Sequence, residues 1–181
     1  MAQPDVIAAG RTALLKRFSW VDGHADVWRA FEDPDAFRDV VAALATLASH
    51  GLPTKVVSVE SRGFILGGAV AHELGAGFQA IRKPGSLFPG PKQIITTDRD
   101  YRGKEYELRL RSTLTPADRV VYVDDWIEVG AQGRATRSLV ERSGAEWLGT
   151  VVLVDDTDHD TRQDVGPLRS LVRSGELGES A

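Results

Sequence analysis

Hydrophobic residues along the chain follow two different periods, which alternate from one segment to the next. Short runs rich in Val, Ile and Leu are typical of strands buried on both faces of a parallel sheet. These runs are 55–59, 77–81, 119–123 and 148–154. Residues 63–74 and 134–142 instead carry apolar side chains at helical spacing, and Gly75 stands where it can end the first helix. Two strand–helix–strand units predict an α/β fold, a mainly parallel twisted sheet with right-handed crossovers and flanking helices.

Further segments extend this alternation. Asp33-Pro34 indicates the start of an amphipathic helix over 35–50. The stretch 84–111 is rich in Gly, Pro and charge, and its end at 106–111 alternates like a half-exposed strand. A long segment of this kind inside a compact domain is usually a functional flap or is partly disordered. After Pro167 the pattern predicts a short helix and a frayed end.

Composition narrows the class of protein. The length of 181 residues favours one domain, and 42% apolar with 27% charged residues is ordinary for a soluble protein. The absence of cysteine excludes disulfides and thiolate metal sites. A net charge of -4 argues against nucleic-acid binding by counterion release. No secretory signal and no apolar run of ~20 residues is visible, so we expect a cytoplasmic protein without membrane contact.

The strongest chemical signal lies in residues 120–133. An apolar strand ends in Asp124 and Asp125, and a turn with small residues leads into a helix. Ligands bind beyond the carboxyl ends of parallel strands, and a helix start suits a phosphate. Adjacent carboxylates can accept hydrogen bonds from two ribose hydroxyls and can hold magnesium through water. The alternative is that the two aspartates only end a strand and cap a turn.

Four motifs together resemble those of type I phosphoribosyltransferases, and of their adenine branch in particular. The strand–Asp–Asp–x–x–x–x–Gly segment is similar to the family's motif for phosphoribosyl pyrophosphate (PRPP). Glu60-Ser-Arg-Gly-Phe64 follows the first strand, Arg82-Lys-Pro-Gly85 follows the next, and an Asp-Pro precedes the early helix. The resemblance runs from about Phe18 to about Asp155.

This resemblance implies one phosphoribosyltransferase domain over 1–181, with hood elements at 1–35 and about 155–181 and a flap at 84–111. It implies a Mg²⁺-dependent pentosyltransferase that moves ribose 5-phosphate from PRPP to a nucleobase, adenine or another purine, and releases pyrophosphate. A homodimer follows only from the resemblance. Carried over by position, the ribose contacts are Asp124 and Asp125, and the 5-phosphate loop is Val129, Gly130, Ala131, Gln132 and Gly133. The pyrophosphate contacts are Ser61, Arg62, Arg82 and Lys83, and Asp100 and Tyr101 match an acidic–tyrosine pair in a mobile loop. The catalytic candidates are Glu128, Arg62 and Tyr101.

The sequence departs from the family in the phosphate loop. Where adenine-type enzymes usually read Ala-Thr-Gly-Gly-Thr, this chain reads Glu128-Val-Gly-Ala-Gln132, so both threonine hydroxyls are missing. Each hydrogen bond lost from a charged group costs on the order of 1.5–3 kcal/mol, although the Gln132 side chain can restore one donor. The 6-oxopurine branch has an acidic residue at the position of Glu128, facing N7 of the base. Glu128 is therefore the candidate general acid/base, against the alternative of a solvated glutamate at a turn.

The base-recognition segments differ as well. Residues 20–27 shorten the family's hood, and Asp155-Asp-Thr-Asp-His-Asp160 replaces a Glu-Leu ending. That acidic cluster is more typical of a solvated loop than of a metal site, or else it contacts the base edge. The identity of the base stays open. Two alternatives to the purine transferase are a PRPP-binding regulator without turnover and a transferase for a non-purine acceptor.

Overall fold

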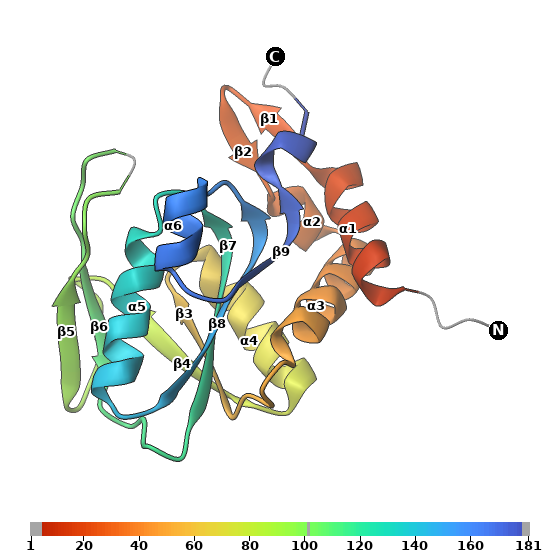
Figure 1. Ribbon diagram of the computed structural model, residues 1–181. Helices are drawn as coiled ribbons and strands as arrows, with labels where there is room; N and C mark the ends of the chain where they lie inside the picture. The colour runs from red at the N-terminus through yellow and green to blue at the C-terminus, as the bar shows by residue number, and fades with distance from the viewer. Residues whose placement is uncertain (1–4, 101, 179–181) are drawn as a thin grey trace.

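The computed structural model describes residues 5–100 and 102–178, and its centre is a seven-stranded sheet (Figure 1). The strands lie in the order β5-β6-β4-β3-β7-β8-β9. From β4 to β9 all neighbours run parallel, while β5 and β6 form an antiparallel hairpin at one edge. The mainly parallel α/β fold is therefore confirmed. The strands are β3 Lys55–Val59, β4 Gly77–Arg82, β5 Lys92–Thr96, β6 Glu107–Arg111, β7 Arg119–Ile127, β8 Glu146–Asp155 and β9 Leu168–Arg173.

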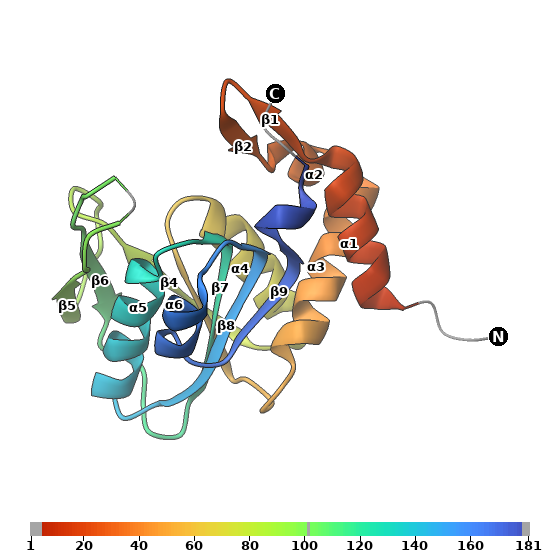
Figure 2. The same ribbon diagram turned by 45° about the horizontal axis from the view of Figure 1, so that its top comes forward.

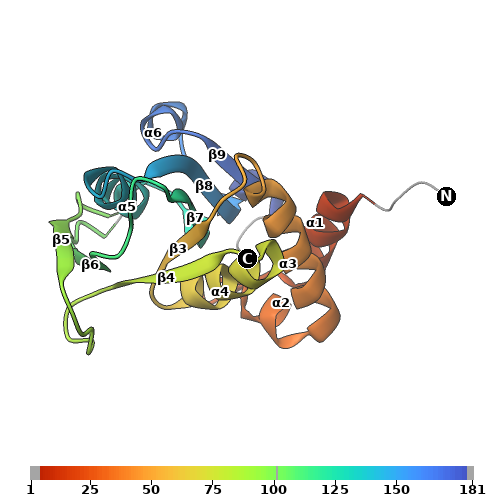
Figure 3. The ribbon, with the colours of Figure 1, turned by 90° about the horizontal axis from the view of Figure 1, so that it is seen from below.

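Helices cover both faces of the sheet, as the view from below shows (Figure 3). On one face lie α1 (Val6–Arg17), α3 (Pro34–Ala48) and α4 (Arg62–Leu74); on the other lie α5 (Ala131–Arg142) and α6 (His159–Asp164). Successive side chains of β3 alternate between the faces. Val56 packs in the core beneath α3 and α4, and Val57 packs with Leu139 of α5. No helix in the described residues is long and apolar enough to cross a membrane.

A small hood stands above the carboxyl ends of the strands. It consists of the hairpin of β1 (Ser19–Val21) and β2 (His24–Asp26) and the short α2 (Trp28–Glu32). Figure 2 turns this hood forward and shows it beside the end of the chain, where a 3-10 turn, η1, spans Ser174–Glu176. The indole Nε1 of Trp20 donates to the carbonyl oxygen of Gly178 at 3.1 Å. The hood hairpin thus contacts the last residue of the chain that the structure describes.

Several predicted elements have the expected bounds. The helix predicted at 63–74 is α4, and Gly75 ends it in the left-handed conformation with φ 64°. The amphipathic helix α3 begins directly after Asp33, whose carboxylate accepts from the backbone N–H groups of Asp35 and Ala36. Strand β7 runs further than predicted, through Asp124 and Asp125 to Ile127. The acidic pair therefore lies within the last part of the strand, where Asp124 is in register with Val152 of β8.

The prediction for the tail after Pro167 was wrong. Residues 168–173 form the edge strand β9, which pairs parallel with β8, and a 3-10 turn follows it in the part of the tail that the structure describes. Leu168, Leu171 and Val172 are buried, whereas Arg169 and Ser170 between them interrupt the apolar pattern that would indicate a strand. Helices α1 and α6 and strand β5 were also not predicted. α6 lies in the acidic cluster and is capped by Asp158, whose Oδ1 accepts from the N–H of Thr161 at 2.7 Å.

Candidate active site

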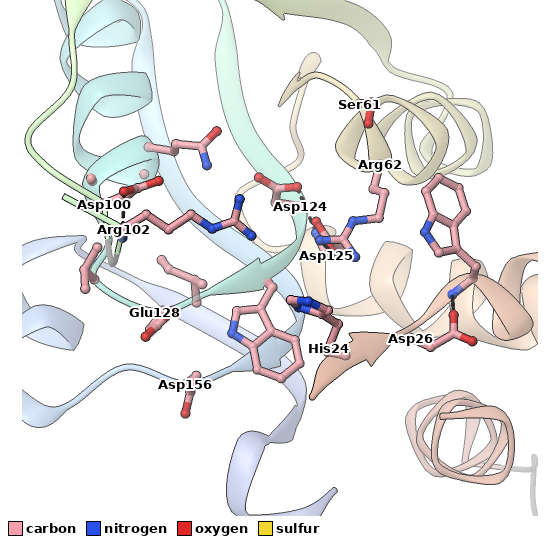
Figure 4. A pocket seen from close by; sticks show the side chains of 18 of the residues that line it. His24, Asp26, Ser61, Arg62, Asp100, Arg102, Asp124, Asp125, Glu128 and Asp156 are labelled. Carbon is pink, nitrogen blue, oxygen red and sulfur yellow. Dashed lines mark hydrogen bonds and ion pairs between the residues drawn. The ribbon is translucent and has the colours of Figure 1, made fainter. Parts of the chain in front are cut away.

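A cavity of about 1550 Å³ lies where the strands end, bounded by the hood, the flap and the starts of α4 and α5 (Figure 4). Polar and charged side chains make up most of its lining. Nearly all residues proposed from the sequence meet here: Ser61, Arg62, Lys83, Asp124, Asp125, Glu128, Val129, Gly130, Ala131, Gln132 and Gly133. Arg82 does not line the cavity, and Tyr101 lies outside the described residues. Three segments that are separated in sequence, 61–62, 83 and 124–133, thus meet in one cavity.

The acidic pair lies at the bottom of this cavity. Asp124 is buried; it accepts from the Tyr122 hydroxyl, and its Oδ1 accepts from the Asp125 N–H at 2.9 Å. Burial, together with the charge of Asp125, raises the pKa of Asp124 well above its ordinary value, although the Tyr122 hydrogen bond opposes this. The ionised carboxylate is therefore disfavoured until donors or a positive charge approach it. Such a pair is suited to bind hydroxyl groups or a hydrated cation.

The turn between β3 and α4 supplies the positive charge beside this pair. Arg62, the first residue of α4, places Nη2 at 2.9 Å from Oδ2 of Asp125. The Glu60–Ser61 peptide bond is cis. A Cβ on Gly63 would stand only 2.8 Å from Oδ1 of Asp124, so glycine is what allows the helix to approach so closely. Helix start, guanidinium and carboxylates therefore meet within a few ångströms.

Glu60 connects this turn to the end of β4. Its Oε2 accepts from Nε of Arg82 at 2.7 Å, and its Oε1 accepts from the backbone N–H of Lys83. The Arg82 guanidinium also lies over the ring of Phe64, 5.8 Å from its centroid. Arg82 is thus committed to holding Glu60, whereas Lys83 lines the cavity, with Nζ 4.8 Å from the Tyr106 ring centroid. The sequence predicted that both residues contact the pyrophosphate, but in the structure only Lys83 faces the cavity.

The loop between β7 and α5 presents backbone N–H groups to the cavity at the start of α5. Gly130 adopts φ 69° and precedes α5, and within the described residues no side chain caps that helix start. A Cβ on Gly130 would lie 2.7 Å from Val165 and 2.9 Å from Thr161, so α6 packs directly beneath the loop. The first N–H groups of a helix are unpaired and positive, which suits an anion. No acidic residue lies in the first turn of α5 to oppose one.

The flap closes the side of the cavity next to α5. Its tip turns on Asp100, whose Oδ1 accepts from the N–H groups of Arg102 and Lys104 at 2.8 and 2.9 Å. Nε of Arg134 on α5 donates to Oδ2 of Asp98 at 3.0 Å. Asp100 and Arg102 line the cavity, and Arg102 is a residue that the sequence did not single out. Its position depends on the hairpin of β5 and β6, which only the fold reveals.

Glu128 lies between the flap and the end of β8. It is partly buried, and burial, followed by the charges of Asp156 and Asp100, raises its pKa. Asp156 donates its backbone N–H to the Ile127 carbonyl oxygen at 2.8 Å and also lines the cavity. A raised pKa makes this carboxyl group a better proton acceptor than an ordinary glutamate, as a general base requires.

The rest of the acidic cluster has a structural role. Asp155 is fully buried and accepts from Nη1 of Arg173 at 2.7 Å and from the N–H of Thr157 at 2.9 Å; Arg162 forms a second ion pair with it. Among the residues that the structure describes, no group of three or more His, Asp or Glu side chains is arranged to hold a metal ion. The solvated-loop interpretation is therefore wrong for Asp155, which anchors β9 and α6.

Aromatic side chains form the wall towards the hood. Trp20 and Trp126 lie edge to face with their ring centroids 6.2 Å apart, and both line the cavity. Phe18 packs against Trp20 with centroids 5.3 Å apart. Trp126 also packs against the main core. A wall of this kind offers apolar contact to a planar ring.

Comparison with known proteins assigns the family. No protein-family model matches the chain. An adenine phosphoribosyltransferase from a Synechococcus strain is 42% identical over 131 residues, covering 72% of this chain and 74% of that protein. The one from Streptomyces coelicolor is 41% identical over 130 residues, with coverages of 72% and 70%. The chain belongs to the adenine phosphoribosyltransferase family.

Solved structures of this family superpose on nearly the whole chain. The enzyme from Giardia lamblia complexed with 9-deazaadenine is 30% identical and superposes with a TM-score of 0.78, covering 93% of this chain and 97% of that one. The one from Rhodothermus marinus is 29% identical with a TM-score of 0.78 and coverages of 92% and 99%. The family fold therefore extends over nearly the whole chain.

Proposed function

We propose that the protein is an adenine phosphoribosyltransferase, which transfers ribose 5-phosphate from PRPP to adenine, forms AMP and releases pyrophosphate in purine salvage. The observation that carries this proposal is the meeting of a buried acidic pair, an uncapped helix start and an arginine turn in one cavity of a family member. In the reaction, the bond from C1 of the ribose to a pyrophosphate oxygen breaks. The bond from C1 to a nitrogen of the base forms, and the base loses its imidazole proton.

The binding roles follow from the chemistry of each wall. Asp124 and Asp125 accept the two ribose hydroxyls, and the backbone of 129–133 binds the 5-phosphate with the help of the Gln132 amide. Ser61, Arg62 and Lys83 surround the pyrophosphate, where negative charge develops as it leaves. Arg82 acts as a positioning residue for this wall because its guanidinium holds Glu60.

Magnesium fits this set of donors as an ion carried by PRPP. The adjacent carboxylates supply the oxygen acceptors that a hydrated cation needs, and the charge of such a cation would favour the ionised form of Asp124, which burial and Asp125 disfavour. When bound to the pyrophosphate, the ion supplies charge neutralisation of the leaving group. Asp124 and Asp125 would hold it through water.

Glu128 is the proposed acid/base. Its raised pKa and its place beside Trp126 allow it to take the imidazole proton from N7 of the base as C1 bonds to the opposite ring nitrogen. The same carboxyl returns the proton in the reverse reaction. Tyr101 remains a sequence-based proposal.

A PRPP-binding protein without turnover is the second candidate, favoured by Val129 and Gln132, which replace the two threonine hydroxyls. A transferase for a non-purine acceptor is favoured by the altered hood. We also propose a homodimer, supported by the exposed apolar side chains Ile65 of α4 and Phe78 of β4 on neighbouring elements. Light scattering after size-exclusion chromatography tests the dimer.

The deciding experiment measures pyrophosphate release from PRPP and magnesium with adenine, with other purines and pyrimidines, and without base. Release that depends on adenine supports the proposal. Tight PRPP binding without release for any base supports the regulator, and release with a pyrimidine only supports the non-purine transferase. Asp125→Asn should lose PRPP affinity, while Asp160→Asn, an exposed carboxylate on α6, should not. Unchanged PRPP binding by Asp125→Asn would contradict the ribose role.

A further inference from the structure

The ends of β7 and β8, beside Trp126, form a wall of the cavity to which the proposed function assigns no contact with PRPP. In Figure 4, Glu128 and Asp156 lie on the side of the cavity away from Ser61 and Arg62. With the 5-phosphate at α5 and the pyrophosphate at Arg62, this side is where the base extends from C1.

The sheet brings these two carboxyl groups together. Strands β7 and β8 are parallel, and Ile127 is in register with Asp155, so the next residues, Glu128 and Asp156, leave the sheet side by side. The hydrogen bond from the Asp156 N–H to the Ile127 carbonyl oxygen, 2.8 Å long, extends the pairing by one step. The charge of Asp156 contributes to the raised pKa of Glu128, as expected for neighbouring groups.

Asp156 is also held in place. Its Oδ1 accepts from the hydroxyl of Ser174 in η1, and the side chain is half-buried. The adjacent residue, Asp155, is fixed by Arg162 and Arg173. A carboxylate fixed at the strand end presents a hydrogen-bond acceptor at a defined place in the cavity.

We infer that Asp156 determines base specificity, by accepting a hydrogen bond from the amino group at position 6 of a purine whose N7 faces Glu128. The inference rests on the proposed function and names its acceptor class, the 6-aminopurines. N7 and the 6-substituent are neighbours on one edge of a purine, as Glu128 and Asp156 are neighbours at one edge of the sheet.

The discrimination has a simple electrostatic cause. A 6-amino group donates to the Asp156 carboxylate, whereas a 6-oxo group places a second acceptor against it. Losing a hydrogen bond to a charged group lowers affinity on the order of 10- to 100-fold. Repulsion between the carboxylate and the 6-oxo oxygen lowers the affinity for a 6-oxopurine further. Glu128 can share a proton with N7 in both classes of purine, so the choice between them rests on Asp156.

The test compares kcat/KM for adenine and hypoxanthine in wild type, Asp156→Asn and Asp22→Asn. An asparagine amide can turn its N–H towards a 6-oxo group, so the adenine-to-hypoxanthine ratio should fall by on the order of 100-fold in Asp156→Asn. Asp22→Asn is the matched control: Asp22 lines the same cavity from the exposed hairpin turn, at φ 50°, a conformation that asparagine tolerates. Its ratio should equal that of wild type. An unchanged ratio in Asp156→Asn would overturn the inference.

A second experiment compares adenine with unsubstituted purine, which lacks the 6-amino group. Its first arm uses the wild-type protein, so it does not depend on whether a variant folds. Wild type should prefer adenine to purine by at least 10-fold, and Asp156→Ala, which removes the acceptor, should largely lose that preference. Equal use of the two bases by wild type would also overturn the inference. If wild type releases no pyrophosphate with any base, the proposed function itself fails; adenine-dependent release with an unaltered ratio defeats only the role of Asp156.

Discussion

The two turns that follow β3 and β7 bound the same cavity but are built by different means. The β3–α4 turn is held by charged side chains, through the Arg62–Asp125 and Arg82–Glu60 pairs. The β7–α5 loop is held by apolar packing of Val165 under Gly130 and presents backbone N–H groups. Binding by backbone depends little on side-chain identity. This difference explains how the second loop can lose two threonines, whereas the first keeps its family motif.

Among the variants that test the difference between the two turns, we expect Arg62→Ala to have the largest effect on activity. Arg62→Ala removes the cation beside Asp125 and the proposed stabilisation of departing pyrophosphate. We expect kcat/KM for PRPP to fall on the order of 10²- to 10³-fold, the usual effect of losing one preorganised donor. Arg137→Ala is the control, because Arg137 lies on the outer face of α5, where it pairs with Glu141. Equal kinetics in both variants would remove Arg62 from the catalytic machinery.

Gly63→Ala tests how tightly the first turn is packed. The new Cβ would approach Oδ1 of Asp124 to 2.8 Å, so α4 must shift. We expect the free energy of unfolding to fall by about 1–3 kcal/mol and PRPP binding to weaken, measured by urea denaturation and calorimetry. Gly68→Ala on the same helix meets open space and should raise stability by up to about 1 kcal/mol. Similar effects at both glycines would argue against the close approach.

Val129→Thr tests whether the β7–α5 loop binds phosphate mainly through its backbone. The substitution nearly conserves shape and returns one hydroxyl to the phosphate loop. We expect KM for PRPP to fall by about 10-fold or less, because the backbone N–H groups already provide most of the binding. A gain of several hundredfold would show instead that the loop depends on side-chain donors.

The smallest expected effect is a shift in pH dependence. A base must be ionised to accept a proton, so activity should rise with pH through the Glu128 pKa, which lies above the ordinary glutamate value. Removing the Asp156 charge lowers that pKa, and the acidic limb of the kcat/KM profile should move to lower pH in Asp156→Asn. Glu128→Gln should abolish the limb and slow turnover far more than it weakens PRPP binding. A limb that persists in Glu128→Gln belongs to another group.

The sequence revealed those parts of the fold and site that depend on short stretches of chain. The buried strands and the segment around Asp124 and Asp125 could be predicted because periodicity and turn composition are local. The pairing of Glu128 with Asp156 depends on the register between β7 and β8, which joins residues far apart in sequence. The edge strand β9 was missed because its fit to the sheet depends on β8, not on its own pattern.

One contact between the flap and α5 is an ion pair whose free energy depends on the salt concentration of the solvent. This pair of Arg134 and Asp98 leaves the Asp98 side chain 69% exposed. Exposed ion pairs contribute little, and salt screens them over about 8 Å at physiological ionic strength. We therefore expect this ion pair to contribute little to holding the flap against α5. If product escape limits turnover, we expect kcat to increase as salt is added, even while KM for the anionic substrate rises.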